Sequence, residues 1–214
     1  MYNPSAFRET DPQTLAAAID SYPLATLVTV GRDGTLDASH IPLLYIASVG
    51  TSGVLQGHMA KANGQWQDYQ DRSPCLAIFL GPEHYISPTW YPSKQLHGKV
   101  VPTWNYVAIH VHGTLTFHDD PDWLIANVAA LTDQQERFHE QPWKVSDAPD
   151  DYIENMLKAI VGIELKISHW QGKWKMSQNR PQEDRAGVAD ALERTPAQTI
   201  PAQVASLVRA SLVK

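Results

Sequence analysis

Short apolar runs, rich in β-branched residues and with few helices between them, constrain the fold of this chain more than any other feature. The clearest run covers residues 24–30; turn residues follow at 31–34 (Gly-Arg-Asp-Gly), and a second extended run continues to Tyr45. This order predicts a β-hairpin. Further strands are predicted at residues 54–58, 75–80, 100–117 with a break at Gly113, and 161–170. Strands in this order favour a mainly β, antiparallel barrel with helical appendages (α+β) over a doubly wound sheet.

Helices are predicted where a proline or an acidic residue precedes apolar residues at three- and four-residue spacing. These starts are Pro12, Pro121 and the neighbourhood of Asp147. After Arg180 the sequence becomes polar and Ala-rich. Helical spacing returns near the end, at Val204, Leu207, Val208 and Leu212. We therefore expect one domain over residues 1–188 and a C-terminal tail over 189–214. The tail is either an arm that docks on a partner subunit or a loosely ordered, isolated amphipathic helix.

Composition limits the classes of function. The chain has 214 residues, of which 43% are apolar, so one domain with appendages is expected. A net charge of −6 and an isoelectric point of about 5.8 mean that DNA binding would need a local basic patch. The single cysteine, Cys75, lies in an apolar run and excludes an intramolecular disulfide. We expect it to be buried. With no signal-like N-terminus and no long apolar run, a cytoplasmic protein without membrane segments is expected.

The segment 57–63 (Gly-His-Met-Ala-Lys-Ala-Asn) follows a predicted strand and is a candidate phosphate site. Its small residues, among them Ala60, let the backbone approach a ligand. His58, Lys61 and Asn63 supply donors and positive charge. The alternative is the start of a surface helix with a solvated lysine.

Other segments combine flat aromatic rings with polar groups or collect cations. Residues 84–94 and 101–106 place tryptophan and tyrosine among hydroxyls and amides, which suits the wall of a pocket for a flat heteroaromatic ring. Packing of these rings in the core is the alternative. Residues 172–180 hold Lys173, Lys175 and Arg180 beside Ser, Gln and Asn, which indicates an anion site. An ordinary solvated basic loop is the alternative.

Other recognised constellations do not occur. His110 and His112 alternate onto one face of a predicted strand, without a cysteine or carboxylate at a zinc-binding spacing, so no metal site is expected. The sequence has no Gly-x-Ser-x-Gly elbow, Walker loop or dinucleotide-binding glycine fingerprint. Hydrolase and nucleoside-triphosphatase functions therefore have no support, and no catalytic residue is assigned.

Taken together, these segments resemble the PaiB-type, FMN-binding negative transcriptional regulators, from Met1 to about residue 188. The similar segments are residues 23–29 (Pro-Leu-Ala-Thr-Leu-Val-Thr), 40–44 (His-Ile-Pro-Leu-Leu), 57–63, 85–91 (Tyr-Ile-Ser-Pro-Thr-Trp-Tyr), 101–106 (Val-Pro-Thr-Trp-Asn-Tyr) and 172–180 (Gly-Lys-Trp-Lys-Met-Ser-Gln-Asn-Arg). The resemblance implies an FMN-binding split β-barrel, similar in fold to pyridoxamine-phosphate oxidase. It also implies a homodimer with two flavins held between the subunits.

Carried onto this sequence, the resemblance assigns three groups of residues to FMN. Thr26 and residues 40–42 would border the ring. His58, Lys61 and Asn63 would hold the phosphate, and residues 177–180 would reach the flavin of the partner subunit. The expected cofactor-binding residues are Thr26, His40, Ile41, Pro42, His58, Ala60, Lys61, Asn63, Trp104, Asn105, Lys175, Ser177, Gln178, Asn179 and Arg180.

The sequence departs from the family at Lys61 and Gly64, where relatives often have Arg and Pro. Lysine can contact a phosphate as a point charge rather than as a fork. The chain also shows no helix-turn-helix with a basic recognition helix, so direct DNA binding is only a possibility. Three functions stay open: an FMN-binding negative transcriptional regulator, a flavin-dependent oxidoreductase acting on a small molecule, and a heme-binding split barrel. For the second, His40, His84 and Tyr85 are the candidate proton donors.

Overall fold

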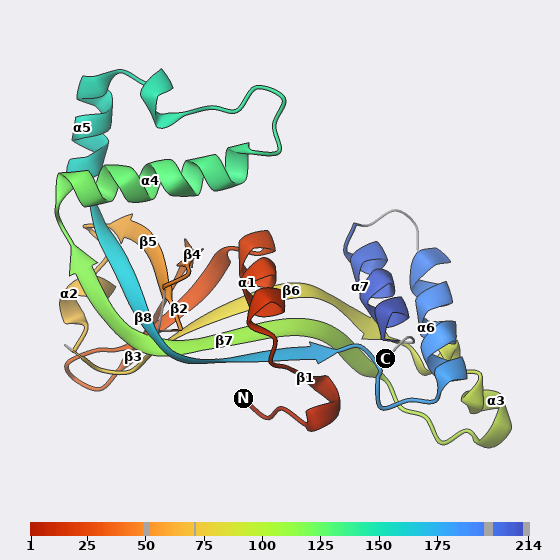
Figure 1. The fold of residues 1–214 in the computed structure, drawn as a ribbon. Coiled ribbons are helices and arrows are strands. Elements are labelled where there is room, and N and C mark those ends of the chain that lie inside the picture. The colour runs from red at the N-terminus through yellow and green to blue at the C-terminus, as the bar shows by residue number, and fades with distance from the viewer. Residues whose placement is uncertain (49–51, 71, 195–198, 212–214) are drawn as a thin grey trace. The chain divides into compact units, whose positions relative to one another are not determined.

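The computed structural model describes residues 1–48, 52–70, 72–194 and 199–211, which form two compact units. Unit 1 comprises residues 1–11, 80–109 and 171–214, and unit 2 comprises residues 12–79 and 110–170. Three long strands contribute to both units: β6 (Cys75–Ile86), β7 (Thr103–His118) and β8 (Ile160–Lys175). They are the long arrows of Figure 1.

An antiparallel sheet is the framework of the fold. Its strand order is β3-β2-β6-β7-β8-β5-β4, with the short β1 (Arg8–Glu9) paired to β8. The remaining strands are β2 (Leu24–Val30), β3 (Leu36–Pro42), β4 (Leu44–Ile46) and β5 (Val54–Ala60). The predicted hairpin is confirmed, since β2 pairs with β3 from Leu24↔Pro42 to Val30↔Leu36. The sheet order ends at β3 and β4, so the described strands form an open, split barrel, as expected.

Two of the three long strands, β6 and β8, extend further than the apolar runs predict, whereas β7 begins at Thr103, three residues after its predicted start. β7 continues through Gly113 without the expected break, because the glycine is required for packing and not for a turn. A Cβ at Gly113 would lie 2.1 Å from the carbonyl oxygen of Lys166 on β8. β6 reaches Ile86 and β8 reaches Lys175, beyond the predicted ends at residues 80 and 170. Polar residues occupy these extensions, and strands exposed on one face accept them.

Three helices of unit 2 correspond to the predicted starts, one of them with a shift, and the short α2 is additional. The helices are α1 (Pro12–Ser21), α2 (Gln65–Asp68), α4 (Pro121–Glu136) and α5 (Asp150–Lys158). Asp120 caps α4, because its Oδ1 accepts a hydrogen bond of 2.9 Å from the backbone N–H of Trp123. The start predicted near Asp147 is a 3-10 turn, η3 (Val145–Asp147), and the α-helix begins three residues later.

Unit 1 has its own core, to which the C-terminal segment contributes. Besides the turns η1 (Ser5–Phe7) and η2 (Pro88–Trp90), its helices are α3 (Ser93–His97), α6 (Gln182–Arg194) and α7 (Thr199–Ala210). The cluster of buried core residues is Ile86, Tyr91, Val107, Met176, Val188, Ala189, Leu192, Val204, Ala205 and Val208. α6 and α7 therefore pack on the ends of the long strands, and Figure 1 draws these two helices side by side.

The predicted helix near the end exists, but it is not isolated. Val204 and Val208 of α7 are fully buried in the same cluster as Val188 and Ala189 of α6. The boundary expected between residues 188 and 189 thus falls inside α6. Leu212, the last residue of the predicted spacing, lies outside the described residues.

Cys75 is buried at the start of β6, as predicted. Its thiol donates to the carbonyl oxygen of Gly113 at 3.3 Å. Burial raises the pKa of the thiol to about 12, so the reactive thiolate is scarce at neutral pH. In the described parts of the chain, no helix is both long and apolar enough to span a membrane.

Candidate functional site

The residues expected at the flavin ring lie on neighbouring strands of unit 2. Thr26 on β2 and His40 on β3 are direct cross-strand partners. Thr26 Oγ1 lies 3.0 Å from His40 Nδ1, and the imidazole is exposed. Ile41 is buried, whereas its neighbours His40 and Pro42 are exposed. Because successive side chains of a strand point to opposite faces, a ligand beside His40 could meet Ile41 only through its backbone.

The expected phosphate segment forms a fixed turn between β5 and α2. The backbone N–H of Asn63 donates to the carbonyl oxygen of Ala60 at 2.9 Å. The Asn63 side chain donates to Ser39 Oγ at 2.8 Å and accepts from the backbone N–H of Gln65 at 3.0 Å. Trp66 Nε1 donates to the carbonyl oxygen of Lys61 at 2.9 Å. The amide of Asn63 therefore holds the turn together, while Ala60 is exposed at its start.

Lys61 is held by an ion pair that sequence analysis missed. Its Nζ lies 2.5 Å from Oδ1 of Asp119, which precedes α4. The Lys61 side chain is 33% exposed and the Asp119 side chain is 70% exposed. A phosphate approaching from solvent could therefore replace Asp119 without burying a carboxylate. The sequence gives Asp119 only as part of a helix start, so no signal connects it to Lys61.

His58 faces α4 rather than the turn. Its Nδ1 lies 3.2 Å from Oδ1 of Asn127, a residue that is almost completely buried on α4. On the neighbouring strand, a Cβ at Gly162 would collide with the ring of Trp123, one turn before Asn127 on α4. His58 therefore lies beneath α4, and Asn127 is a second contact for which the sequence holds no signal.

A second group of expected site residues lies in unit 1, where the end of β8 meets β7. Asn105 is completely buried and Ser177 is 3% exposed. Ser177 Oγ lies 3.1 Å from both Nδ2 and Oδ1 of Asn105, so the two side chains satisfy each other. Ser177 has a φ of 65°, which is uncommon for a residue with a side chain. The structure brings Asn105 and Ser177 together as a rigid buried pair.

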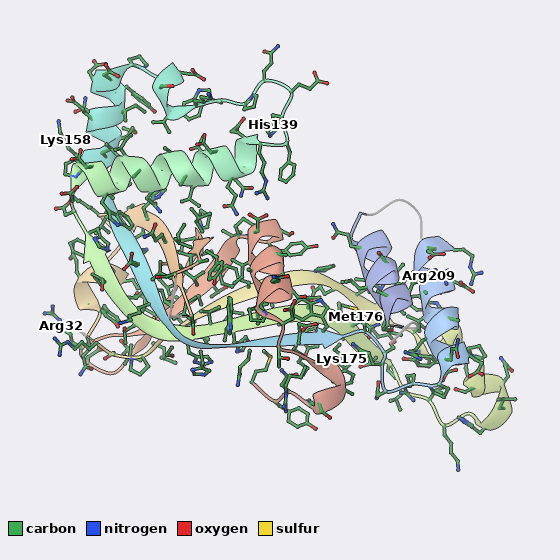
Figure 2. All side chains as sticks on the ribbon, viewed as in Figure 1. Arg32, His139, Lys158, Lys175, Met176 and Arg209 are labelled. Atoms are coloured by element: carbon green, nitrogen blue, oxygen red, sulfur yellow. The ribbon has the colours of Figure 1, made fainter. Side chains whose placement is uncertain are left out.

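Lys175 supplies the cation of this second group. Its Nζ donates to Thr103 Oγ1 and to the carbonyl oxygen of Trp104, the latter at 2.5 Å. Burial lowers the pKa of Lys175, and the nearby charges of Lys173 and Arg180 lower it further. Figure 2 labels Lys175 and Met176 at the end of β8. Lys175 is therefore a partly desolvated cation bound to neutral oxygens.

The turn after β8 uses most of the remaining expected residues. Gln178 donates to the carbonyl oxygen of Trp174 at 2.6 Å and accepts from the backbone N–H of Met176 at 2.7 Å. The guanidinium of Arg180 lies 5.0 Å from the centre of the buried Tyr91 ring. Asn179 is exposed. In this turn only Asn179 points freely to solvent among the expected residues 177–180.

Lys173 changes the interpretation of the basic segment. It is almost fully buried, donates to the carbonyl oxygen of Tyr2 at 2.9 Å, and lies 5.2 Å from the centre of the Tyr106 ring. With Lys175 and Arg180 also held by protein groups, residues 173–180 do not form the ordinary solvated basic loop that was the alternative. Nor do they offer an open cationic surface.

The aromatic residues of unit 1 divide between the core and the surface. Tyr91 is buried, and burial raises the pKa of its hydroxyl. Trp104 is 51% exposed, and its ring lies edge-on to that of the exposed Tyr85, with centroids 6.1 Å apart. Core packing is thus confirmed for Tyr91, whereas the pocket wall stays a prediction for the exposed Trp104 and Tyr85.

The histidines of β7 lie as predicted but do not gather metal ligands. His110 and His112 have ring centroids 6.5 Å apart, and His112 stacks on His169 of β8 at 4.3 Å. Burial lowers the pKa of His110 and of His112. Within the described residues, no three side chains of His, Cys, Asp or Glu are placed to hold a metal ion.

Comparison with known proteins identifies the family. Residues 1–169 match the family model described as "Putative FMN-binding domain". The chain belongs to this family. The chain is also 30% identical over 193 residues to the Bacillus subtilis (strain 168) protein "Protease synthase and sporulation protein PAI 2", covering 90% of this chain and 89% of that one. This confirms the relationship to the PaiB-type proteins. FMN is the cofactor that family membership assigns.

Further relatives extend the comparison. An uncharacterized protein of Emericella nidulans is 36% identical over 227 residues, covering 90% of each chain. The FAD and heme binding protein from Mycobacterium smegmatis has a TM-score of 0.57 at 19% identity, with 84% of this chain and 78% of that one covered. The flavocytochrome Anf3 from Azotobacter vinelandii has a TM-score of 0.55 at 14% identity, with 90% and 77% covered. At these identities the solved structures confirm the fold alone.

The residues present fit FMN. A phosphate needs a cation and hydrogen-bond donors, and Lys61 offers an accessible ammonium beside the exposed backbone turn at Ala60. The edge of a flavin ring needs donors and acceptors, which Thr26 and His40 present together. Considered by itself, unit 1 exposes the indole of Trp104, a flat apolar surface of the kind on which a flavin ring can stack. When bound, the flavin would supply redox chemistry that no side chain here can provide.

Proposed function

We propose that this chain acts as an FMN-binding negative transcriptional regulator of the PaiB type. We further propose that it works as a homodimer with its flavin sites at the subunit interface. The relationship to the Bacillus protein, over 90% of this chain, supports the regulatory role. The name of that protein links it to protease synthesis and sporulation.

The observation that carries the dimer is an exposed apolar surface in unit 1. Trp104, Tyr85 and Val101 are all large, apolar and more than two-fifths exposed. Trp104 precedes the buried Asn105 in sequence, and its ring lies against that of Tyr85. Large contiguous exposed apolar residues mark interaction surfaces in soluble proteins. In the proposed dimer, the partner subunit would cover this surface. A flavin bound to the Thr26–Lys61 region of one subunit would cover it as well.

The arrangement of the cations shapes how regulation would work. Lys173, Lys175 and Arg180 are bound to protein oxygens or rings, so they do not form a ready surface for DNA phosphates. We therefore propose that FMN occupancy is the switched state, and that any direct contact with DNA is weak and differs between the FMN-free and FMN-bound forms.

Two measurements test this proposal. Sedimentation velocity, with and without FMN, is expected to give a dimer, and Trp104→Asp is expected to weaken both dimer and FMN binding. Leu36→Asp, an exposed residue of β3, is the matched control. A monodisperse monomer that still retains FMN would overturn the interfacial site. The second measurement titrates a labelled duplex from the promoter of this protein's gene with the FMN-free and the FMN-bound protein at fixed salt. The two binding curves are expected to differ, and identical curves would overturn FMN as the switch.

A second candidate is a flavin-dependent oxidoreductase that acts on a small molecule. The exposed imidazole of His40, 3.0 Å from Thr26 Oγ1, favours it, because a proton donor beside the ring is what such chemistry requires. Anaerobic reduction of the FMN-bound protein, followed by reoxidation with small electron acceptors, tests it. Turnover that is lost in His40→Gln while FMN affinity is retained would support the enzyme. The absorption spectrum of the purified protein separates either function from heme binding.

A further inference from the structure

An open groove in unit 2 is lined by none of the residues expected to bind FMN. Its volume is about 620 Å³, and it is lined by α4, η3 and α5. The groove lies on one face of α4, and the buried core lies on another. Leu124, Asn127 and Leu131 are buried on the core face. Ile125, which follows Leu124, and Ala129, which stands two residues before Leu131, line the groove on another face of α4.

The opposite wall of the groove is α5, a helix whose apolar side chains are incompletely buried. α5 carries Ile153 and Leu157 toward the groove, yet none of its residues is buried. Tyr152 and Met156, on the same helix, are 55% and 46% exposed. A short amphipathic helix normally buries its apolar face. The apolar surface of α5 therefore continues out of the groove and remains available to a partner.

Carboxylates border the groove on both walls. Asp122 and Asp133 line it from α4, and Asp150 and Glu154 line it from α5. All four are exposed, and within the described residues none of them forms a salt bridge. Lys144 is the lysine that lines the groove. The charge around an apolar floor is therefore strongly negative.

The spacing of these carboxylates indicates the shape of a partner. Asp122 and Asp133 are separated along α4 by about 16 Å at 1.5 Å per residue, which equals about three helical turns. Asp150 and Glu154 lie one turn apart on the facing wall. A compact cation would use one or two of the carboxylates and little of the floor. A helix three turns long could place apolar residues on the floor and cations along both rims.

We propose that the groove between α4 and α5 binds a basic amphipathic helix of a partner protein. Leucine-like residues at i, i+3 or i+4, and i+7 pack on Ile125, Ala129, Ile153 and Leu157. Lysines or arginines that flank this stripe meet the carboxylates of both walls. A second copy of this chain fits the groove poorly, because the chain carries a net charge of −6.

The test uses the full-length, FMN-bound protein and a fluorescently labelled model peptide. The probe is a 14-residue peptide of leucine and lysine with one apolar face, and its control has the same composition in an order that leaves no apolar face. We expect anisotropy to show saturable binding of the first peptide alone. Asp150→Lys and Glu154→Lys should each weaken it about three- to tenfold, since each replaces an attraction by a repulsion.

Asp151→Lys is the matched control for Asp150→Lys. Both residues are exposed and lie in the first turn of α5, and the two variants have the same net charge, but only Asp150 lines the groove. Asp151→Lys should leave the affinity within about twofold. Ala129→Leu, which fills the groove and changes no charge, should weaken binding. Circular dichroism checks that α5 stays helical in each variant.

Three results would overturn the proposal. Equal weakening by Asp150→Lys and Asp151→Lys would indicate general electrostatic attraction. Equal binding of the two peptides would exclude recognition of an apolar face. A change of sedimenting mass in Asp150→Lys but not in Asp151→Lys would assign the groove to a second copy of this chain.

Discussion

The two groups of expected FMN residues differ in how the protein holds them. In unit 2, Thr26, His40 and Lys61 have single polar contacts near solvent. In unit 1, Asn105 and Ser177 are buried and satisfy each other. The first group lies near solvent, and Lys61 would exchange Asp119 for a ligand phosphate. The second group is enclosed by the protein, so we expect the resemblance in sequence to cover both residues that contact a ligand and residues that support those contacts.

The family model covers the unit 2 group completely and the unit 1 group in part, since Trp104 and Asn105 of unit 1 also lie within residues 1–169. Lys175 and residues 177–180 lie beyond it, although relatives match 90% of the chain. Substitutions in the two groups should therefore separate residues that contact a ligand from residues that support the fold.

Removing the buried amide in unit 1 should have the largest effect. Asn105→Ala leaves the Ser177 hydroxyl buried without its partner and creates a cavity, so the unfolding free energy of FMN-free protein should fall by about 2–4 kcal/mol. Urea denaturation measures it. Thr26→Val, which removes one exposed hydroxyl and keeps the β-branched shape, should change stability by less than about 0.5 kcal/mol. A comparable loss in both variants would break the distinction between the groups.

Removing the unit 2 cation should affect binding and leave the fold intact. Lys61→Ala should weaken FMN by about 1.5–3 kcal/mol, or roughly ten- to a hundredfold, and leave riboflavin unchanged. Its exposed pair with Asp119 contributes at most about 1 kcal/mol to stability. Fluorescence titration with both flavins measures it. Lys158→Ala, an exposed lysine of α5, is the control. Equal weakening of FMN and riboflavin would make Lys61 a supporting residue.

Removing the competitor of the phosphate should strengthen binding. In Asp119→Asn, Lys61 loses its carboxylate partner, so FMN should bind about 1.5- to 5-fold more tightly, which corresponds to the 0.2–1 kcal/mol of an exposed ion pair. The adjacent Asp120→Asn removes the same charge, and asparagine still caps α4. If both variants gain equally, the effect belongs to net charge and not to the Lys61–Asp119 pair.

The sequence predicted the hairpin, the main helices and the open antiparallel sheet because alternation, turn residues and proline starts are local signals. It placed the strand ends too early, since polar residues such as His84 and Lys173 continue a strand when one face meets solvent or a second segment. No local sequence pattern predicts the packing of α7 on α6. For the site, the resemblance supplied the residues, but the partners Asp119 and Asn127 follow only from contacts between distant segments.

The smallest effect concerns the protonation of Lys175 in unit 1. Burial lowers its pKa in the folded chain below the ordinary value of 10.5. Between the lowered pKa and 10.5, the unfolded chain therefore holds more protons, so this group makes stability rise as the pH rises through that interval. Lys175→Met abolishes this contribution. The difference in unfolding free energy between wild type and variant should move in favour of wild type with rising pH, by less than about 1.4 kcal/mol per pH unit. Lys94→Met, an exposed lysine of α3, controls for the loss of one lysine. Urea denaturation from pH 7 upward measures the slope, and parallel curves for wild type and Lys175→Met would place Lys175 with the solvent-facing residues of unit 2 rather than with the supporting residues of unit 1.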